Sequence, residues 1–172
     1  MKKFLFSLVL SLAAFSSSYA SCPAYANFFS ISSQPVLADA AVRFDLQNLH
    51  RYITLSNDGF SVTVEHTGNY SIALVATGSL GESGTQVVGP WSVGLYQNGS
   101  LVPGSVAAAH NGTDADDNLI TLTTTSNVIV RAVKGDVFQV RNTTFSEIEL
   151  IGTISGGAPQ NTSVSINFHQ IR

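Results

Sequence analysis

The sequence is short of the residues that crosslink or charge a small domain. Its 172 residues include one cysteine, one tryptophan and one methionine, and only 11% of them are charged. Because Cys22 is the single cysteine, no disulfide can form within the chain, and the hydrophobic core must hold the fold together. Hydrophobic residues make up 44% of the chain, an ordinary share for a packed domain. We therefore expect a surface covered mainly by Ser, Thr, Asn and Gly.

The scarcity of basic residues excludes two classes of partner. The formal net charge is -3 at pH 7, from 8 basic and 11 acidic residues. A weakly acidic chain lacks the electrostatic footprint of a nucleic-acid-binding protein. It also lacks the polybasic patch that attaches proteins to anionic membranes. We predict no nucleic acid among the partners.

The N-terminus has the three parts of a secretion signal. Basic residues in Met1-Lys2-Lys3 precede an apolar run over residues 4–15, and Ser18-Tyr19-Ala20 has the small-x-small pattern of a cleavage site. The apolar run is too short to span a membrane. We predict a signal peptide over residues 1–20 and a secreted or surface-exposed domain over residues 21–172, with no transmembrane segment.

Cys22 directly follows the predicted cleavage site. The order Tyr19-Ala20-Ser21-Cys22 is similar to a bacterial lipobox, but Tyr19 stands where Leu is expected. Lipid anchoring through Cys22 is therefore the less favoured alternative to a free thiol or an interchain bond.

The rest of the chain has the pattern of β-structure. Alternating polar and apolar residues indicate strands with one buried face, and Gly, Asn, Asp and Pro punctuate them. We predict one all-β domain of about ten strands, with no helix, as an antiparallel β-sandwich. An up-and-down barrel is the alternative architecture that the pattern also allows. The runs cover residues 24–30, 42–44, 52–55, 60–65, 70–76, 91–97, 100–106, 119–124, 128–133, 137–142, 147–151 and 163–169.

Several local details go with these strands. Residues 78–89 read as a glycine-rich loop, and Asn98-Gly99 between two apolar runs predicts a type I′ hairpin turn. A further turn is expected at Lys134-Gly135-Asp136. Period two places Phe60, Val62 and Val64 inward. In the last strand it places Val164, Ile166 and Phe168 inward and Ser163, Ser165, Asn167 and His169 outward.

One acidic cluster is a candidate metal site. Three carboxylates and an amide lie close together at Asp114, Asp116, Asp117 and Asn118, and such oxygen ligands suit Ca²⁺. The cluster is not an EF-hand, because the turn glycine is missing and Thr125 stands where the bidentate Glu belongs. We favour a solvated loop, with a calcium site as the alternative. No other cofactor is predicted.

No catalytic constellation is visible in the sequence. The histidines at positions 50, 66, 110 and 169 lack metal-ligand spacing, and there is no Gly-x-Ser-x-Gly motif. Glu147 and Glu149 share one face of a predicted strand, where paired carboxylates could serve glycoside hydrolysis. Solvated charges are the more common outcome, so we predict a protein that is not an enzyme. An extracellular hydrolase is the weakest alternative.

Four stretches in order resemble a known family. They cover residues 24–29, 67–72, 94–105 and 134–142, and the last is continued by residues 156–166. Together they resemble the C-terminal head domain of collagen-like exosporium glycoproteins (BclA type). This family belongs to the jelly-roll group of tumour necrosis factor and the complement globular heads.

The resemblance implies a jelly roll that assembles as a homotrimer, with one sheet of each subunit facing the threefold axis. It places the strands of Phe28, Phe138, Val140 and Phe168 nearest that axis. It implies structural display, adhesion or binding of an extracellular receptor or glycan, without catalysis. The second hypothesis is a calcium-assisted carbohydrate-binding module, lectin-like in function.

Overall fold

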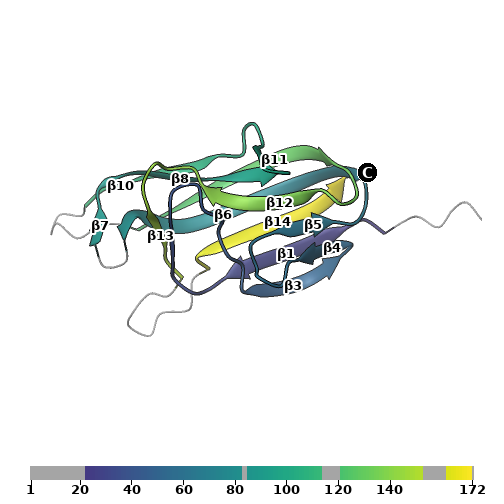
Figure 1. Cartoon of the computed structure of the whole chain (residues 1–172), viewed down its shortest axis with the longest axis horizontal. Coiled ribbons are helices and arrows are strands. Elements are labelled where there is room, and N and C mark those ends of the chain that lie inside the picture. Colours follow the sequence, from purple (N-terminus) through teal and green to yellow (C-terminus); the bar gives the residue numbers. More distant parts are fainter. Residues whose placement is uncertain (1–21, 83–84, 114–120, 153–161, 172) are drawn as a thin grey trace, which may run out of the picture.

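Every regular element of the structure is a β-strand. The computed structural model describes residues 22–82, 85–113, 121–152 and 162–171, and within these ranges the chain forms 14 strands. Figure 1 shows them running along the long axis of the molecule in two stacked layers. All of the strand pairs are antiparallel. The predicted antiparallel β-sandwich is confirmed.

The first sheet is organised by the long strand β6 (Gly68–Glu82). One side of β6 pairs with β14 and β13, and the other side pairs with β11 and β7. The sheet continues from β14 to β1 and the edge strand β3, and from β13 to β2. The bounds are β1 Tyr25–Ser30, β2 Gln34–Val36, β3 Leu46–Arg51, β7 Thr85–Val87, β11 Leu122–Ala132, β13 Ile148–Leu150 and β14 Val164–Ile171.

The second sheet has the order β10-β8-β12-β5-β4, with β9 paired to β8. The chain passes between the two sheets several times, which produces the crossed connections of a jelly roll. The bounds are β4 Ile53–Leu55, β5 Val62–Val64, β8 Gly89–Gln97, β9 Ser100–Leu101, β10 Ala107–Asn111 and β12 Val137–Asn142. Within the described residues, no helix is long and apolar enough to cross a membrane.

The core forms where alternate side chains of the two sheets meet. Val164, Ile166 and Phe168 of β14 are all at most 2% exposed, as their alternation predicts. Phe168 meets Phe138 of the second sheet edge to face, with ring centroids 5.5 Å apart and planes at 70°. Aromatic pairs prefer this geometry, because the positive edge of one ring meets the negative face of the other. The contact joins the two sheets across the core.

The turn at Asn98-Gly99 forms as predicted. Asn98 has φ of 51° and Gly99 has φ of 81°, the left-handed values that a type I′ turn requires at both positions. The Asn98 side chain also donates to a carboxylate oxygen of Asp136 at 2.8 Å and accepts from the Val137 N–H at 2.9 Å. The predicted turn at Gly135, with φ of 95°, is thereby tied to the hairpin.

Asp136 receives several hydrogen bonds at this junction. Its carboxylate accepts from the Val133 N–H and from the side chains of Asn98 and Gln97. These donors favour the charged form, and they hold the pKa of Asp136 below its ordinary value of 3.8. The carboxylate therefore helps to hold two turns together while it is ionised.

Several segments differ from the sequence prediction. Residues 78–89 were expected as a loop, but β6 extends to Glu82 and pairs there with β7. Two strands are expected at residues 119–124 and 128–133, whereas residues 122–132 form the single strand β11, since Ser126 and Asn127 pair with Leu74 and Ala73 of β6. Ser126 and Asn127 look like a break between two strands in the sequence. The long strand β6 supplies backbone partners at both positions, so the strand continues through them.

Some side chains differ from the expectation in whether they face the core or the solvent. Phe60 precedes β5 and is 37% exposed rather than inward. Ser163 is buried rather than outward, because its hydroxyl donates to the Ser30 carbonyl oxygen at 3.0 Å. Residues 42–44 form no strand, although Val42 and Phe44 are buried and their N–H groups donate to Val140 and Gly59. Tertiary contacts decide these positions.

The aromatic contact between the sheets can be tested by truncation. We expect Phe138→Ala to lower the free energy of unfolding by about 3–5 kcal/mol, because it leaves a cavity opposite Phe168. Thr54→Ala changes an exposed side chain of β4 in the same sheet, and it should cost at most about 1 kcal/mol. Urea unfolding at one fixed protein concentration measures both. Equal losses for the two variants would contradict the packing described here.

The junction at Asp136 predicts a pH-dependent stability. Because the folded-state pKa is lowered, the contribution of Asp136 is complete above the unfolded-state pKa and is lost as the pH falls through the folded-state value. The unfolding midpoint of Asp136→Asn should therefore lie below that of the original chain at about pH 6, with the gap closing towards about pH 3. Lys134→Gln, in the same turn, keeps the carboxylate and should keep the acid dependence. A gap that is constant with pH would refute the assignment.

Candidate functional site

The outward sides of β1, β14, β6 and β11 in the first sheet form a broad surface with little charge. Four strands contribute to it, and we call it the outer sheet face. At the outward positions of these four strands, Arg131 alone carries a permanent charge. Arg51, at the end of the neighbouring edge strand β3, pairs with Tyr25 and adds a second charge at the rim of this surface. The outer sheet face consists of Tyr25, Asn27, Phe29, Ser71, Ala73, Val75, Thr77, Thr123, Thr125, Asn127, Ile129, Arg131, Ser165, Asn167 and His169.

Cross-strand register arranges these side chains in rows. One row contains Phe29, Ser165, Val75 and Thr125, and the next contains Asn27, Asn167, Ala73 and Asn127. Within the rows, the Asn27 amide donates to the Asn167 amide oxygen at 2.7 Å, and the hydroxyls of Thr77 and Thr123 are 2.9 Å apart. Such pairs satisfy polar groups inside the sheet face. The face thus offers both apolar area and polar groups whose hydrogen bonds are already made.

The most solvent-accessible part of this face lies towards β11. Ile129 is 72% exposed, whereas Val75 and Phe29 are half-buried. Beyond β11, a hollow of about 430 Å³ separates the first sheet from the β8–β9 hairpin. It is lined by Gln97, Ser100, Leu101, Val102, Pro103, Ile129 and Val130. Polar and apolar side chains both line this hollow at the edge of the sandwich.

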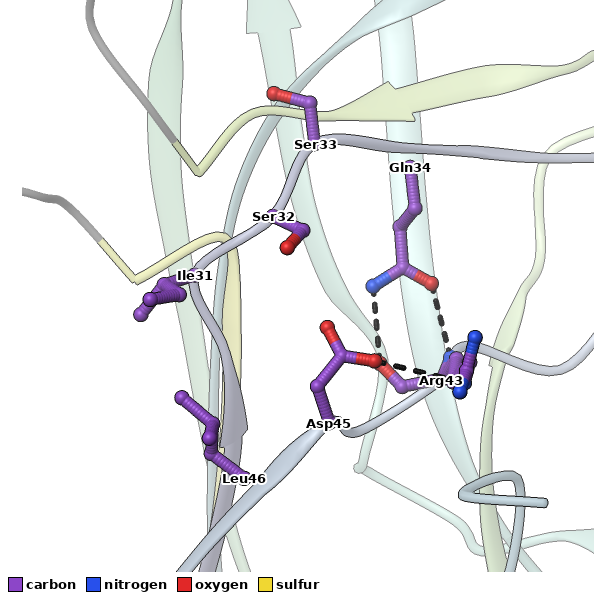
Figure 2. A pocket seen from close by; sticks show the side chains of 7 residues that line it. All are labelled: Ile31, Ser32, Ser33, Gln34, Arg43, Asp45 and Leu46. Atoms are coloured by element: carbon purple, nitrogen blue, oxygen red, sulfur yellow. Dashed lines mark hydrogen bonds and ion pairs between the residues drawn. The ribbon is translucent and has the colours of Figure 1, made fainter.

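A second hollow of about 380 Å³ lies where β1, β2 and β3 meet. Figure 2 shows its seven lining side chains: Ile31, Ser32, Ser33, Gln34, Arg43, Asp45 and Leu46. They come from two stretches of sequence, residues 31–34 and residues 43–46. We call this hollow the Arg43–Asp45 pocket.

Hydrogen bonds hold the polar wall of this pocket in place. The Gln34 side chain bonds both ways with the Arg43 backbone: its amide nitrogen donates to the carbonyl oxygen and its amide oxygen accepts from the N–H, both at 2.9 Å. The Ser30 hydroxyl donates to the Asp45 carboxylate at 2.6 Å. The Arg43 Nε lies 3.5 Å from the other Asp45 oxygen. Both charged groups remain partly open to solvent, with 58% of the Arg43 side chain and 31% of the Asp45 side chain exposed.

The four residues that the resemblance assigns to a subunit interface are in the core. Phe28, Phe138, Val140 and Phe168 are at most 2% exposed between the sheets of a single chain. Side chains buried in this way offer no surface to a second subunit, which corrects their assignment as contacts. Phe138 and Val140 also belong to β12 of the second sheet. Contacts through β1 and β14 would instead involve their outward neighbours, such as Phe29.

The acidic cluster cannot be placed in the fold. Asp114, Asp116, Asp117 and Asn118 lie outside the described residues. Residues 1–20, the predicted signal peptide, lie outside them as well. Elsewhere in the described chain, no three His, Cys, Asp or Glu side chains gather where they could hold a metal ion. The calcium site stays a prediction from the sequence.

Thermal unfolding with and without calcium tests that prediction. If the cluster binds Ca²⁺, millimolar calcium should raise the melting temperature, because a ligand that binds only the folded state stabilises it. Asp116→Ala should remove the rise. Asp58→Ala is the matched control, since Asp58 is an exposed aspartate that bonds only within its own turn. No rise in the original chain would leave the solvated loop as the better interpretation.

The remaining candidate side chains lie apart from one another. Glu149 is 8% exposed on β13 between the buried Ile148 and Leu150, so the expected solvated pair with Glu147 does not form. The His66 ring stacks on Tyr52 with centroids 3.8 Å apart. Cys22 is exposed at the start of the described chain.

Comparison with solved structures places the chain in the jelly-roll class of tumour necrosis factor and the complement globular heads. Eiger TNF from S. frugiperda is similar with a TM-score of 0.64 and 16% identity, over 88% of this chain and 94% of that one. The globular domain of zebrafish complement 1qA is similar with a TM-score of 0.54 and 11% identity, over 87% of this chain and 98% of that one. Murine APRIL at pH 5.0 is similar with a TM-score of 0.52 and 11% identity, over 87% of this chain and 100% of that one.

These likenesses confirm the tumour-necrosis-factor-like fold. At such low identity they concern the fold alone, and membership of the BclA-type family stays a prediction. The sequence matches no protein-family model and no curated protein.

Sequence reasoning identified neither the outer sheet face nor the Arg43–Asp45 pocket. The alternation along each strand indicates that Asn27, Phe29 and Ser165 point away from the core. It does not indicate that these residues share one sheet. For the pocket, the only available signal was the spacing of Arg43 and Asp45, which puts both side chains on one side of an extended segment.

Proposed function

We propose that this chain is a secreted, non-enzymatic jelly-roll module that assembles as a homotrimer and acts by display, adhesion or ligand binding. The observation that carries the proposal is the outer sheet face, where β1, β14, β6 and β11 present a single permanent charge, Arg131, with Arg51 of β3 at the rim. Depletion of charge with retained aromatic and aliphatic area is typical of the centre of a protein interface. Apart from Glu149, which is buried in β13 of the first sheet, the other described charges lie in loops, on the second sheet and at strand ends.

A second copy of the chain is the occupant that the surface favours. The outer sheet face differs in composition from the neighbouring β8–β9 hairpin, where Leu101 and Pro103 are exposed beside Gln97 and Ser100. When one surface of a subunit packs against a different surface of the next, the contact is head-to-tail and can close into a ring. A trimer is the ring that the family resemblance implies. The non-enzymatic role rests on the likeness of the fold to tumour necrosis factor and complement heads.

The assembly is tested by absolute mass. We expect light scattering during size exclusion to give three times the monomer mass for the mature chain. Val75→Arg should yield monomers, since it puts an unpaired charge in the middle of the outer sheet face. Gln139→Arg makes the same kind of change on the second sheet, and it should leave the trimer intact.

A stable monomer from the original chain would refute the trimer. Dissociation by Gln139→Arg but not by Val75→Arg would move the interface to the second sheet. Circular dichroism and the melting temperature of each variant distinguish loss of assembly from loss of folding.

A further inference from the structure

The Arg43–Asp45 pocket combines features that suit one chemical class of ligand. We propose that it binds a neutral saccharide through hydroxyl groups. The proposal deepens the binding role above by naming a ligand class and a site. It uses neither calcium nor the acidic cluster of the sequence.

The size and walls of the pocket are the first observation. Its volume of about 380 Å³ falls within the range of about 300–1,000 Å³ typical of small-ligand sites. In Figure 2, Ile31 and Leu46 lie on one side, Gln34 and Arg43 lie on the other, and Asp45 stands between them. A sugar ring likewise has an apolar side of C–H groups and a rim of hydroxyls. The two walls match these two sides.

The second observation is the pairing of a donor with an acceptor. The ion pair engages Nε of Arg43, and the two terminal guanidinium nitrogens remain to donate outward. Asp45 can accept further hydrogen bonds, because a carboxylate has more acceptor sites than its bonds to Ser30 and Arg43 occupy. A hydroxyl both donates and accepts. Two adjacent hydroxyls can therefore bond to Asp45 and Arg43 together.

The third observation is that the polar wall is already ordered. Gln34 holds the Arg43 backbone through two hydrogen bonds, and Ser30 orients the Asp45 carboxylate. A ligand then need not pay for ordering this wall, which improves affinity. The Ser32 hydroxyl at the rim adds a group that can donate to a ligand. The Ser33 hydroxyl oxygen already accepts from the Gly152 N–H at 3.2 Å.

Charge decides between a neutral and an anionic ligand. The pocket lining contains one cation, Arg43, and one anion, Asp45, so its net charge is zero. An anionic ligand at Arg43 would approach the Asp45 carboxylate, which is partly exposed beside it. Like charges repel at such a distance. A neutral polyol meets no such repulsion.

The experiment is a titration of the assembled mature protein with sugars of defined charge. The probes are the methyl glycosides of glucose, galactose, mannose, fucose and N-acetylglucosamine, with methyl glucuronide as the anionic comparison. We expect at least one neutral glycoside to bind saturably by calorimetry or ligand-observed NMR, and more tightly than the glucuronide. Arg43→Gln and Asp45→Asn should each weaken that binding about tenfold or more.

Two further variants make the test specific to this pocket. Ser32→Trp places a large side chain at the exposed rim and should block binding without touching the core. Lys134→Gln removes an exposed cation at the turn beside Gly68 and should leave binding unchanged. Ser32→Trp also serves as the main test if Arg43→Gln or Asp45→Asn is poorly folded.

Three results would overturn the proposal. They are no binding of any neutral glycoside, binding that survives both Ser32→Trp and Arg43→Gln, and tighter binding of the glucuronide. Light scattering on the same samples separates this proposal from the proposed assembly. A monomer that binds sugar refutes the trimer alone, and a trimer that binds none refutes the pocket alone.

Discussion

The structure depends on burying one side of two sheets against each other without a crosslink. Cys22 is exposed and is the single cysteine, so the contacts between sheets must provide the stability. Phe138 and Phe168 meet edge to face between the sheets, and Trp91 and Tyr70 are fully buried in the same core. Once these inner sides are occupied, the outer sides of both sheets are left for other roles. The outer sheet face and the pocket are consequences of that division.

The length of β6 sets the extent of the first sheet. It reaches from Gly68 to Glu82 and pairs with four other strands. Because β11 lies along eleven residues of it, the outer sheet face is wide and continuous. A shorter β6 would remove its pairing with β7 and β13, and the corner where β13 pairs with β2 would lose its support. The Arg43–Asp45 pocket lies beside this corner, next to Gln34.

Local pattern predicted a good deal of this fold. The alternation of Val164, Ile166 and Phe168 identified the buried side of β14, and Asn98-Gly99 identified its turn from residue type alone. Both signals succeed because the cause is local: side chains alternate along any strand, and Asn and Gly tolerate positive φ. The predictions failed at Ser163 and Glu149, where a distant partner or a neighbouring strand buries a polar residue.

The sequence by itself determined that the chain is all β, uncrosslinked and able to form a sandwich. Those properties follow from composition and period, which each stretch carries without knowledge of its neighbours. Only the tertiary structure decided which strands share a sheet, and therefore that Phe29 and Val75 lie in one row. It alone brought Gln34 against the backbone of Arg43. The physical reason is that strand order depends on contacts between distant residues, and the period of a strand contains no information about its partner.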